Sequence, residues 1–555
     1  MMVRVVGAWG FAFIGLVAVA CGGDDEPSTT CGAGTALKGS ECVAAAGAGG
    51  MGGDPPCAEG DCGGSGGSVG GQLEGGTAHG GSAGQGAAAG SDVGGAGMAG
   101  GAGGAALGGA GAGGGDNRLI TRWLAFEHED GAFVYDVTQF PDPGALLQLG
   151  TGRLGTWSPD GRQLLYSQQG AWYVRDLAAE TPGRAVLLVE SAQLLPHLAW
   201  SADSKSIAMT QGTTLSVLAP SEAAPSLVAL TATLIAYKWA PVGNKLVYAD
   251  ASGGHVVDVV AGVPGEPVAV DPRARQWSPN GDALAANHSD GTLTLTNLHS
   301  VPPTVTTLFA PTGPGTGMES VLFNRDGSRL ATDGWKDRDE MDAFYVDLLP
   351  TPGALSTPYA ELPETQGASS VGWSPNGDFL LYHRYDDETD TGQYFAVDVS
   401  GEGPGTPVPL AAHTLEAPLW LAGGLKLITD ATASSVAIFD LLAPESPQPL
   451  LQGVALSACV LNPAGSVLGY RTPRALRLLD LAAPQQPPTE IELLQVAGNV
   501  GKWAWSPDGS FIAAVTLTSS DQQRLVRIDD DGLTASTPIS LGTPSDDAVF
   551  FRWQP

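Results

Sequence analysis

The chain has 555 residues, 79 of them glycine, and a formal net charge of −32, because 58 acidic residues outnumber 26 basic ones. Glycine stands at about twice its usual share of roughly 7%, which indicates a biased segment joined to an ordinary one. Binding to nucleic acid needs a surplus of lysine and arginine against the phosphates, so the acidic balance excludes nucleic acid as a partner.

Residues 1–20 are predicted to be an export signal. Arg4 is the only charged residue before an apolar run of about 16 residues, which is short for a membrane-spanning helix and typical of a signal peptide. The run ends in Ala18-Val19-Ala20-Cys21, where the small residues form a cleavage site. Cleavage alone would release a soluble protein to the periplasm or the exterior, and an uncleaved run would remain as a short helix.

The same run resembles a bacterial lipoprotein signal, in which the cysteine after the cut is acylated. This resemblance implies that Cys21 carries the lipid, with Ala18 standing where the family usually has leucine. Gly22, not aspartate, follows the cysteine, which in enteric-type lipoproteins implies sorting to the outer membrane. Acyl chains anchor a protein without spanning the bilayer, so we expect membrane contact through the N-terminal lipid alone.

Four further cysteines lie in residues 21–62, the segment after the cleavage site. Four cysteines in an oxidising compartment predict two disulfides, in one of three connectivities. Short loops favour Cys31–Cys42, which would staple a small hairpin, and Cys57–Cys62. Zinc is the alternative, but no histidine is near and the paired spacing of zinc sites is missing. The sequence therefore predicts no metal and no other cofactor.

Residues 63–116 are predicted to form a flexible tether. They are roughly half glycine, with alanine and serine as most of the rest, so they cannot bury enough apolar surface to fold. Two G-x-S-x-G matches, at 63–67 and 80–84, lack the strand and helix that a nucleophile elbow requires. The tether therefore offers no catalytic serine.

Residues 117–555 contain one repeated phrase, Trp-Ser-Pro-Asp-Gly and its variants, about every 38 to 50 residues, the spacing expected of propeller blades. Proline, aspartate and glycine in this order predict a tight turn between two apolar strands. A strand ending in Asp plus an aliphatic follows, as in Asp176-Leu177, and then a Pro- and Gly-rich connector and another apolar run. Each unit therefore predicts four antiparallel strands, and the array predicts an all-β propeller. The phrase is centred on Trp157, Trp200, Trp239, Trp277, Phe323, Trp373, Trp420, Leu461 and Trp505.

The two ends of this array complement each other. Residues 123–149 supply the last three strands of a blade, and residues 550–555 supply a first strand. Pairing them would complete a blade, close the ring and remove exposed strand edges. The count is then about ten blades, with a single large ring, two fused rings or a miscounted unit near Trp420 all open.

The hairpins closely resemble the WD40-like repeats of the TolB-type propeller superfamily, which includes the propellers of prolyl oligopeptidase and dipeptidyl peptidase IV type enzymes. The resemblance covers about residues 119–555 and implies a periplasmic interaction platform near the outer membrane. The peptidases add a hydrolase domain with a Ser-His-Asp triad, for which this chain has no believable motif. The helical N-terminal domain of TolB is also missing, and the tether stands in its place. No catalytic residue is therefore carried over.

Several residues have candidate roles. Lys238, Gln276 and Arg552 each precede a repeat tryptophan and are predicted to line the channel. The isolated Cys459 is predicted to be a small buried apolar residue. Acidic stretches are predicted to be solvated turns, with weak metal binding as the alternative. These stretches are 127–130, 337–342, 386–392 and 529–532.

The leading hypothesis is a non-enzymatic interaction module, exported and tethered at the cell envelope, that binds a protein or a glycan. The alternative is a lyase or glycosidase type enzyme that uses paired acids from different blades. Carboxylate, histidine or arginine clusters facing the channel would favour the enzyme, and an apolar or featureless channel would favour the binding module.

Overall fold

The computed structural model describes two short strands and most of the repeat array. The strands β1 (Thr35–Lys38) and β2 (Glu41–Ala44) form an antiparallel hairpin in the segment where a hairpin was expected. The described residues are 35–38, 41–44 and 122–555, without 180–181, 191–196, 221–224, 314–315, 336–341, 349–365, 387–390, 402, 411–416, 433, 483–488, 492–498, 518–521, 530–532 and 545–550.

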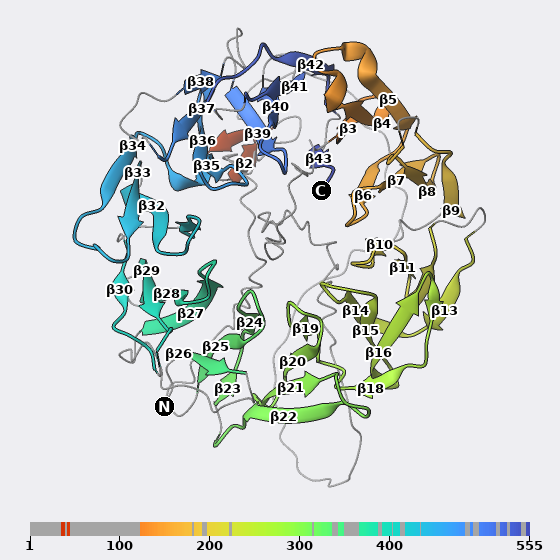
Figure 1. Ribbon diagram of the computed structural model, residues 1–555, viewed down its shortest axis with the longest axis vertical. Helices are drawn as coiled ribbons and strands as arrows, with labels where there is room; N and C mark the ends of the chain where they lie inside the picture. Colours follow the sequence, from red (N-terminus) through yellow and green to blue (C-terminus); the bar gives the residue numbers. More distant parts are fainter. Residues whose placement is uncertain are drawn as a thin grey trace, which may run out of the picture. The chain divides into compact units, whose positions relative to one another are not determined.

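The repeat array forms one ring of ten antiparallel blades, as Figure 1 shows, so the single-ring alternative is correct. Blade 1 contains β43 (Phe551–Trp553), β3 (Trp123–His128), β4 (Gly131–Asp136) and β5 (Leu146–Gly150), and blade 2 contains β6 (Leu154–Trp157), β7 (Gln163–Gln168), β8 (Ala171–Asp176) and β9 (Val186–Glu190). Blade 3 contains β10 (His197–Trp200), β11 (Ile207–Gln211), β12 (Thr214–Leu218) and β13 (Val228–Thr231), and blade 4 contains β14 (Leu234–Trp239), β15 (Lys245–Asp250), β16 (Gly253–Val260), β17 (Val263–Pro264) and β18 (Val268–Val270). Blade 5 contains β19 (Gln276–Trp277), β20 (Ala283–Asn287), β21 (Leu293–Asn297) and β22 (Thr304–Phe309).

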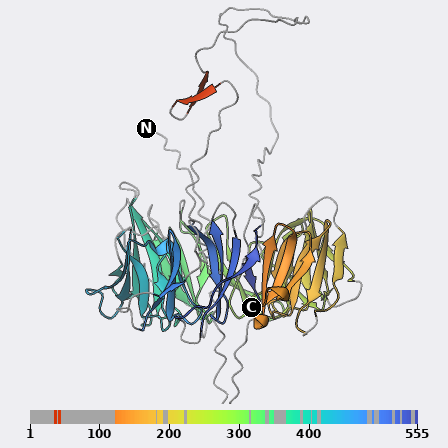
Figure 2. The same cartoon turned by 90° about the horizontal axis from the view of Figure 1, so that it is seen from above.

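The remaining five blades follow in chain order, and Figure 2 shows their strands crossing the ring from face to face. Blade 6 contains β23 (Gly317–Met318), β24 (Leu322–Phe323), β25 (Arg329–Trp335) and β26 (Asp342–Asp347), and blade 7 contains β27 (Gln366–Trp373), β28 (Phe379–Asp386), β29 (Thr391–Asp398) and β30 (Val408–Pro409). Blade 8 contains β31 (Leu419–Trp420), β32 (Lys426–Thr432), β33 (Ser435–Asp440) and β34 (Gln448–Gln452), and blade 9 contains β35 (Cys459–Leu461), β36 (Val467–Thr472), β37 (Ala475–Asp480) and β38 (Thr489–Ile491). Blade 10 contains β39 (Asn499–Trp505), β40 (Phe511–Leu517), β41 (Gln522–Arg527) and β42 (Ile539–Gly542).

Helical structure in the described residues is limited to three 3₁₀ turns, and none of them is long and apolar enough to cross a membrane. Two of the turns follow the third and precede the fourth strand of blade 1, and the third turn precedes β35. They are η1 (Val137–Gln139), η2 (Pro143–Ala145) and η3 (Leu456–Ala458).

The ring closes by pairing the C-terminal strand β43 with β3, which confirms the predicted closure. Leu124 lies opposite Trp553, and Phe126 lies opposite Phe551. Gln554 fixes the junction, because its Oε1 accepts the backbone N–H of Arg122 at 3.0 Å and its Nε2 donates to a backbone oxygen of blade 2 at 2.8 Å. Strand β3 is thus paired on both sides, with β43 and β4, so closure removes the exposed edge that β3 would otherwise have.

The repeated phrase forms the predicted tight turn. In blade 2 the Ser158 hydroxyl donates to Asp160 at 2.6 Å and accepts the N–H of Gln163 at 2.9 Å. Gly161 closes the turn with its N–H bonded to Ser158 O at 2.8 Å, and its φ of +70° favours glycine. In Phe323-Asn324 and Leu461-Asn462 the asparagine side chain replaces the serine.

The core between blades is built from the repeat aromatic and the residue paired with it on the second strand. In all ten blades this paired residue is an aliphatic with 0% exposure, so each phrase anchors one blade against its neighbours. The paired aliphatic residues are Leu124, Leu164, Ile207, Leu246, Leu284, Leu330, Leu380, Leu427, Leu468 and Ile512.

Five repeat tryptophans also join successive blades by one recurring hydrogen bond. Each indole Nε1 donates to the backbone oxygen of the residue just before the repeat aromatic of the preceding blade. Phe323 and Leu461 have no donor for this bond, and the indole Nε1 atoms of Trp420, Trp505 and Trp553 are buried without a hydrogen-bond partner among the described residues. The bonds are Trp157 to Arg552 at 2.9 Å, Trp200 to Thr156 at 3.2 Å, Trp239 to Ala199 at 3.0 Å, Trp277 to Lys238 at 3.2 Å and Trp373 to Leu322 at 2.9 Å.

Candidate functional site

The candidate site is the inner wall, which we define as the residues of β6, β10, β14, β19, β23, β24, β27, β31, β35, β39 and β43. These strands form the inner edges of the blades, and a propeller encloses its channel with such strands (Figure 1). None of these described strands contains aspartate or glutamate, whereas three cations lie in them. The cations are Lys238 in β14, Lys502 in β39 and Arg552 in β43.

Lys238 and Gln276 occupy equivalent positions on neighbouring blades and bond to each other. The ammonium Nζ of Lys238 donates to Oε1 of Gln276 at 3.2 Å. Lys238 is exposed and Gln276 is half-buried, so the pair lies on the surface of the inner wall. Surrounding protein displaces water from the ammonium and thereby lowers the pKa of Lys238 from its usual range. The prediction that these two side chains share the inner wall is consistent with this geometry.

Arg552 lies on β43 opposite Ala125 of β3, in the strand that closes the ring. Its side chain is half-buried, and loss of hydration lowers its pKa while the Glu127 carboxylate opposes that effect. Lys502, in the neighbouring blade 10, is also half-buried. The three cations therefore lie on blades 10, 1 and 4, with the Lys238–Gln276 pair reaching blade 5.

Polar clips between blades were not anticipated from the sequence. In five blades the third residue after the fully buried aliphatic residue of the second strand bonds to the backbone of the next blade, in its first strand or in the link beside that strand. The side-chain types differ, so no repeated motif marks the position. The clips are Glu127 accepting from Leu154 N at 2.8 Å, Asn287 donating to Glu319 O, Asp333 accepting from Ser370 N at 2.8 Å, Asp430 accepting from Leu456 N at 2.8 Å and Arg471 donating to Val500 O at 3.2 Å.

The acids best placed for the enzyme alternative are Glu319 and Asp333. Glu319 is exposed in the link between β23 and β24. Partial loss of hydration at its carboxyl group raises the pKa of Glu319. Desolvation raises the pKa of Asp333 to about 6, but this residue is only 2% exposed and its carboxylate accepts the Ser370 N–H. Asp342 is also buried, yet Asp333 pairs with Ala343, so the two aspartates point to opposite faces of the sheet. These acids therefore do not form a solvent-accessible catalytic pair.

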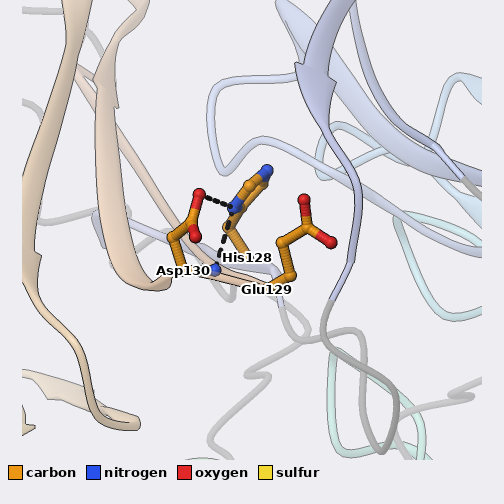
Figure 3. A group of neighbouring side chains, drawn as sticks. All are labelled: His128, Glu129 and Asp130. Atoms are coloured by element: carbon orange, nitrogen blue, oxygen red, sulfur yellow. Dashed lines mark hydrogen bonds and ion pairs between the residues drawn. The ribbon is translucent and has the colours of Figure 1, made fainter.

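The acidic stretch 127–130, predicted to be a solvated turn with weak metal binding as the alternative, brings three side chains together at the turn between β3 and β4. Ligand atoms of His128, Glu129 and Asp130 lie within 4.8 Å of one another, and no other such group occurs among the described residues (Figure 3). However, His128 Nδ1 accepts the backbone N–H of Asp130 at 3.1 Å, so that nitrogen is already used. Asp130 is 72% exposed and Glu129 is also exposed. The group is therefore a solvated turn cap.

A cavity of about 570 Å³ adjoins the ring closure and is lined by Arg122, Asp136, Thr138 and Gln139. Its charges satisfy each other, because Nε and Nη2 of Arg122 both donate to Asp136 at 3.0 Å. Asp136 also accepts the N–H and the hydroxyl of Thr138, which caps η1. This cavity is consequently part of the closure and has no charge left for a ligand.

The other predicted site residues have different outcomes. Cys459 is 1% exposed and burial raises its pKa to about 12, which confirms an inert buried thiol. Cys21, Cys31, Cys57 and Cys62 lie outside the described residues, and Cys42 is described only by its backbone in β2. Acylation and both disulfides stay predictions. Of the acidic stretches, residues 337–341, 387–390 and 530–532 also lie outside the described residues.

No family model matches the chain, and no curated protein matches it. Among solved structures, a eukaryotic initiation factor aligns with a TM-score of 0.48 at 11% identity, over 78% of this chain and 99% of the other. Dipeptidyl peptidase 4 of Porphyromonas gingivalis aligns at 0.41 and 10% identity, over 71% and 60%. The C-terminal WD40 domain of Sif2 aligns at 0.32 and 14% identity, over 67% and 95%. At such identities the similarity concerns the fold, and no function follows from it.

Proposed function

We propose that this protein is an exported, lipid-anchored adaptor of the cell envelope whose β-propeller binds another protein. The inner wall carries this proposal, because a closed ring of ten blades holds cations and an amide on its inner strands. Such groups bind ligands by charge and hydrogen bonding, whereas acid–base catalysis needs paired carboxylates or histidines. The order of export signal, Cys21, tether and propeller supports a site held at a distance from a membrane.

The finer assignments belong to the same proposal. The Trp-Ser-Pro-Asp-Gly hairpins support a TolB-type origin for the repeats, and the signal resemblance supports acylation of Cys21 and an outer-membrane address. The described inner strands carry His197, Lys238, Lys502 and Arg552 on four different blades. They form neither a cluster of carboxylates, histidines or arginines nor an apolar surface, so the inner wall matches neither of the outcomes stated for the channel. Its cationic character favours binding over the lyase or glycosidase alternative.

Photo-crosslinking in the living host tests the adaptor role. A photoreactive residue replaces Thr156 on the inner wall, Val301 (91% exposed) in the link before β22, or Val305 (59% exposed) on the outermost strand β22 of the full chain. We expect a discrete protein adduct from Thr156 or Val301 that is not formed from Val305, which serves as the control for random collision. Absence of adducts at all three positions, together with turnover of envelope polysaccharide by the purified chain, would overturn the proposal in favour of the enzyme.

A further inference from the structure

The described inner strands contain no acid, although the exposed Glu319 lies in the link between β23 and β24, and this absence from the strands is not a consequence of strand structure. Second strands of the same blades carry carboxylates, for example Asp250 in β15, Asp333 in β25 and Asp430 in β32. The whole chain has more than twice as many acids as bases, 58 against 26. Strands of one protein therefore differ in charge according to whether they face the ring centre, which points to a ligand there.

Lys238 differs from two comparable lysines in its partner. Lys245 and Lys426 begin second strands and pair with the carboxylates of Asp258 at 2.8 Å and Asp440 at 3.2 Å. Lys238 bonds only to a neutral amide, and no carboxylate among the described residues pairs with it. Its charge is therefore not neutralised within the described part of the protein.

The Lys238–Gln276 pair has the donors to hold a carboxylate. An ammonium can only donate, so the amide oxygen of Gln276 must face Nζ and its Nε2 group must face away as a second donor. We propose that these two donors bind a carboxylate on an acidic, partly apolar segment of a partner protein. This inference rests on the proposed function, because it specifies the chemistry of the partner that the adaptor binds.

A peptide is favoured over an acidic glycan by the aromatic residues of the inner wall. Sugar binding uses exposed aromatic faces, but the tryptophan, tyrosine and phenylalanine side chains of the described inner strands are all buried or half-buried. Five of the tryptophans also bond through their indoles to the preceding blades, namely Trp157, Trp200, Trp239, Trp277 and Trp373. Ile235, on the same strand as Lys238, is 65% exposed, and it is the exposed large apolar side chain on the described innermost strands. Ile235 lies three residues before Lys238, so this inner strand carries an exposed apolar side chain as well as a cation, which suits a peptide that contains both acidic and apolar residues.

The net charge of the chain makes this binding specific. A charge of −32 repels acidic peptides at long range, and salt at about 0.1 M screens that repulsion beyond roughly 10 Å. Contact with the local cation is then required for any acidic peptide to bind. Long-range electrostatic attraction cannot account for binding of an acidic peptide, because the net charge of the protein is itself negative.

Fluorescence anisotropy of a dye-labelled peptide of alternating glutamate and leucine, mixed with the purified full chain at about 0.1 M salt, tests the site. We expect Lys238→Met to weaken binding at least about fivefold, and Lys238→Arg to retain it. Gln276→Glu supplies an internal carboxylate to Lys238 and should abolish binding while the thermal midpoint is unchanged or raised. Lys245→Met, a lysine of the same blade outside the inner wall, is the matched control and should bind like the wild type.

Several results would contradict the site. Equal binding by Lys238→Met and the wild type, an equal loss in Lys245→Met, or tighter binding of oligogalacturonate than of the peptide would each overturn it. The matching glutamine–leucine peptide should not bind, and binding of that peptide would show that charge is not recognised. If the crosslinking experiment captures a partner while the peptide does not bind, the adaptor role stands and only this inference fails.

Discussion

Trp277 holds Lys238 in place from the neighbouring blade. Its indole Nε1 donates to the backbone oxygen of Lys238 at 3.2 Å, and the preceding residue, Gln276, accepts from the Lys238 ammonium at 3.2 Å. Two consecutive residues of blade 5 thus fix the backbone and the side chain of one lysine of blade 4. The repeat that builds the propeller therefore also positions the candidate site.

Replacing Trp277 with phenylalanine should remove this bond and keep most of the ring packing. We expect Trp277→Phe to lower the free energy of unfolding by about 1 kcal/mol, the usual net contribution of a hydrogen bond, with more if the Lys238 oxygen stays unpaired. Urea unfolding followed by circular dichroism measures the change, and the peptide titration measures the accompanying loss at the site.

Trp420→Phe is the matched control for that substitution. Trp420 is also a repeat tryptophan, but its indole N–H is buried and has no hydrogen-bond partner in the described structure. Its replacement loses ring area but no hydrogen bond, so we expect the smaller cost or a slight gain in stability. Equal losses in the two variants would mean that packing, and not the bond between blades, explains the effect of Trp277→Phe.

The fold was largely predictable because its information is local. Ser158-Pro159-Asp160-Gly161 specifies a turn by its own side chains, and the structure contains the hydrogen bonds that this chemistry requires. Closure was also predictable, since the strand missing from one end is present at the other. The extra fifth strand of blade 4 and the inner edge of blade 6, divided into β23 and β24, were not predicted, because they depend on backbone irregularity within single units.

The site was predictable only in part. Position before a repeat tryptophan indicated Lys238, Gln276 and Arg552, but the bond between the first two depends on side-chain direction across a blade interface. The clips at Asp333 and Asp430 were missed for a related reason. Each side chain satisfies a backbone group whose position is set by the packing of the next blade, and sequence spacing does not report that position.

Asp333 should make stability depend on pH. Burial raises its pKa from the ordinary 3.8 to about 6, so the folded state keeps the proton at pH values where the unfolded chain has lost it. This contribution is fully present below about pH 4 and is lost as the pH rises through about 6. Asp333→Asn keeps an acceptor for Ser370 N–H and has no charge to bury. We expect it to raise the thermal midpoint relative to the wild type at pH 8 and to lose that advantage at pH 4.

Asp333→Ala separates the hydrogen bond from the charge. Alanine leaves the buried Ser370 N–H without its acceptor, which should cost about 1–3 kcal/mol at low pH, where the charge plays no part. Thermal melts of both variants and the wild type across pH 4 to 8 give the comparison. An advantage of Asp333→Asn that is constant over this range would rule out the titration of Asp333 as its cause.

Gln554 should be the main polar residue of the closure. Its side chain accepts the backbone N–H groups of Arg122 at 3.0 Å and Trp123 at 3.2 Å and donates to Gly161 at 2.8 Å. Gln554→Ala leaves these backbone groups without a side-chain partner, and we expect the free energy of unfolding in urea to fall by about 1–3 kcal/mol.

Deleting residues 551–555 removes β43 as well and exposes the edge of β3, so light scattering should detect association that Gln554→Ala does not cause. A truncated chain as monomeric and stable as the wild type would contradict the role of this strand in closing the ring.

Acylation of Cys21 decides how the propeller is held at the envelope. Labelling of growing cells with a radioactive fatty acid should mark the wild-type chain and not Cys21→Ala, because the thiol is the acyl acceptor that the signal resemblance implies. The unlabelled variant should move from the membrane fraction to the soluble fraction, since the acyl chains provide the proposed membrane contact. Its propeller should still bind the glutamate–leucine peptide, because Lys238 and Gln276 are far from the signal in the sequence. Label persisting in Cys21→Ala, or a wild-type chain without label, would show that the lipid assignment is wrong while leaving the inner-wall site untouched.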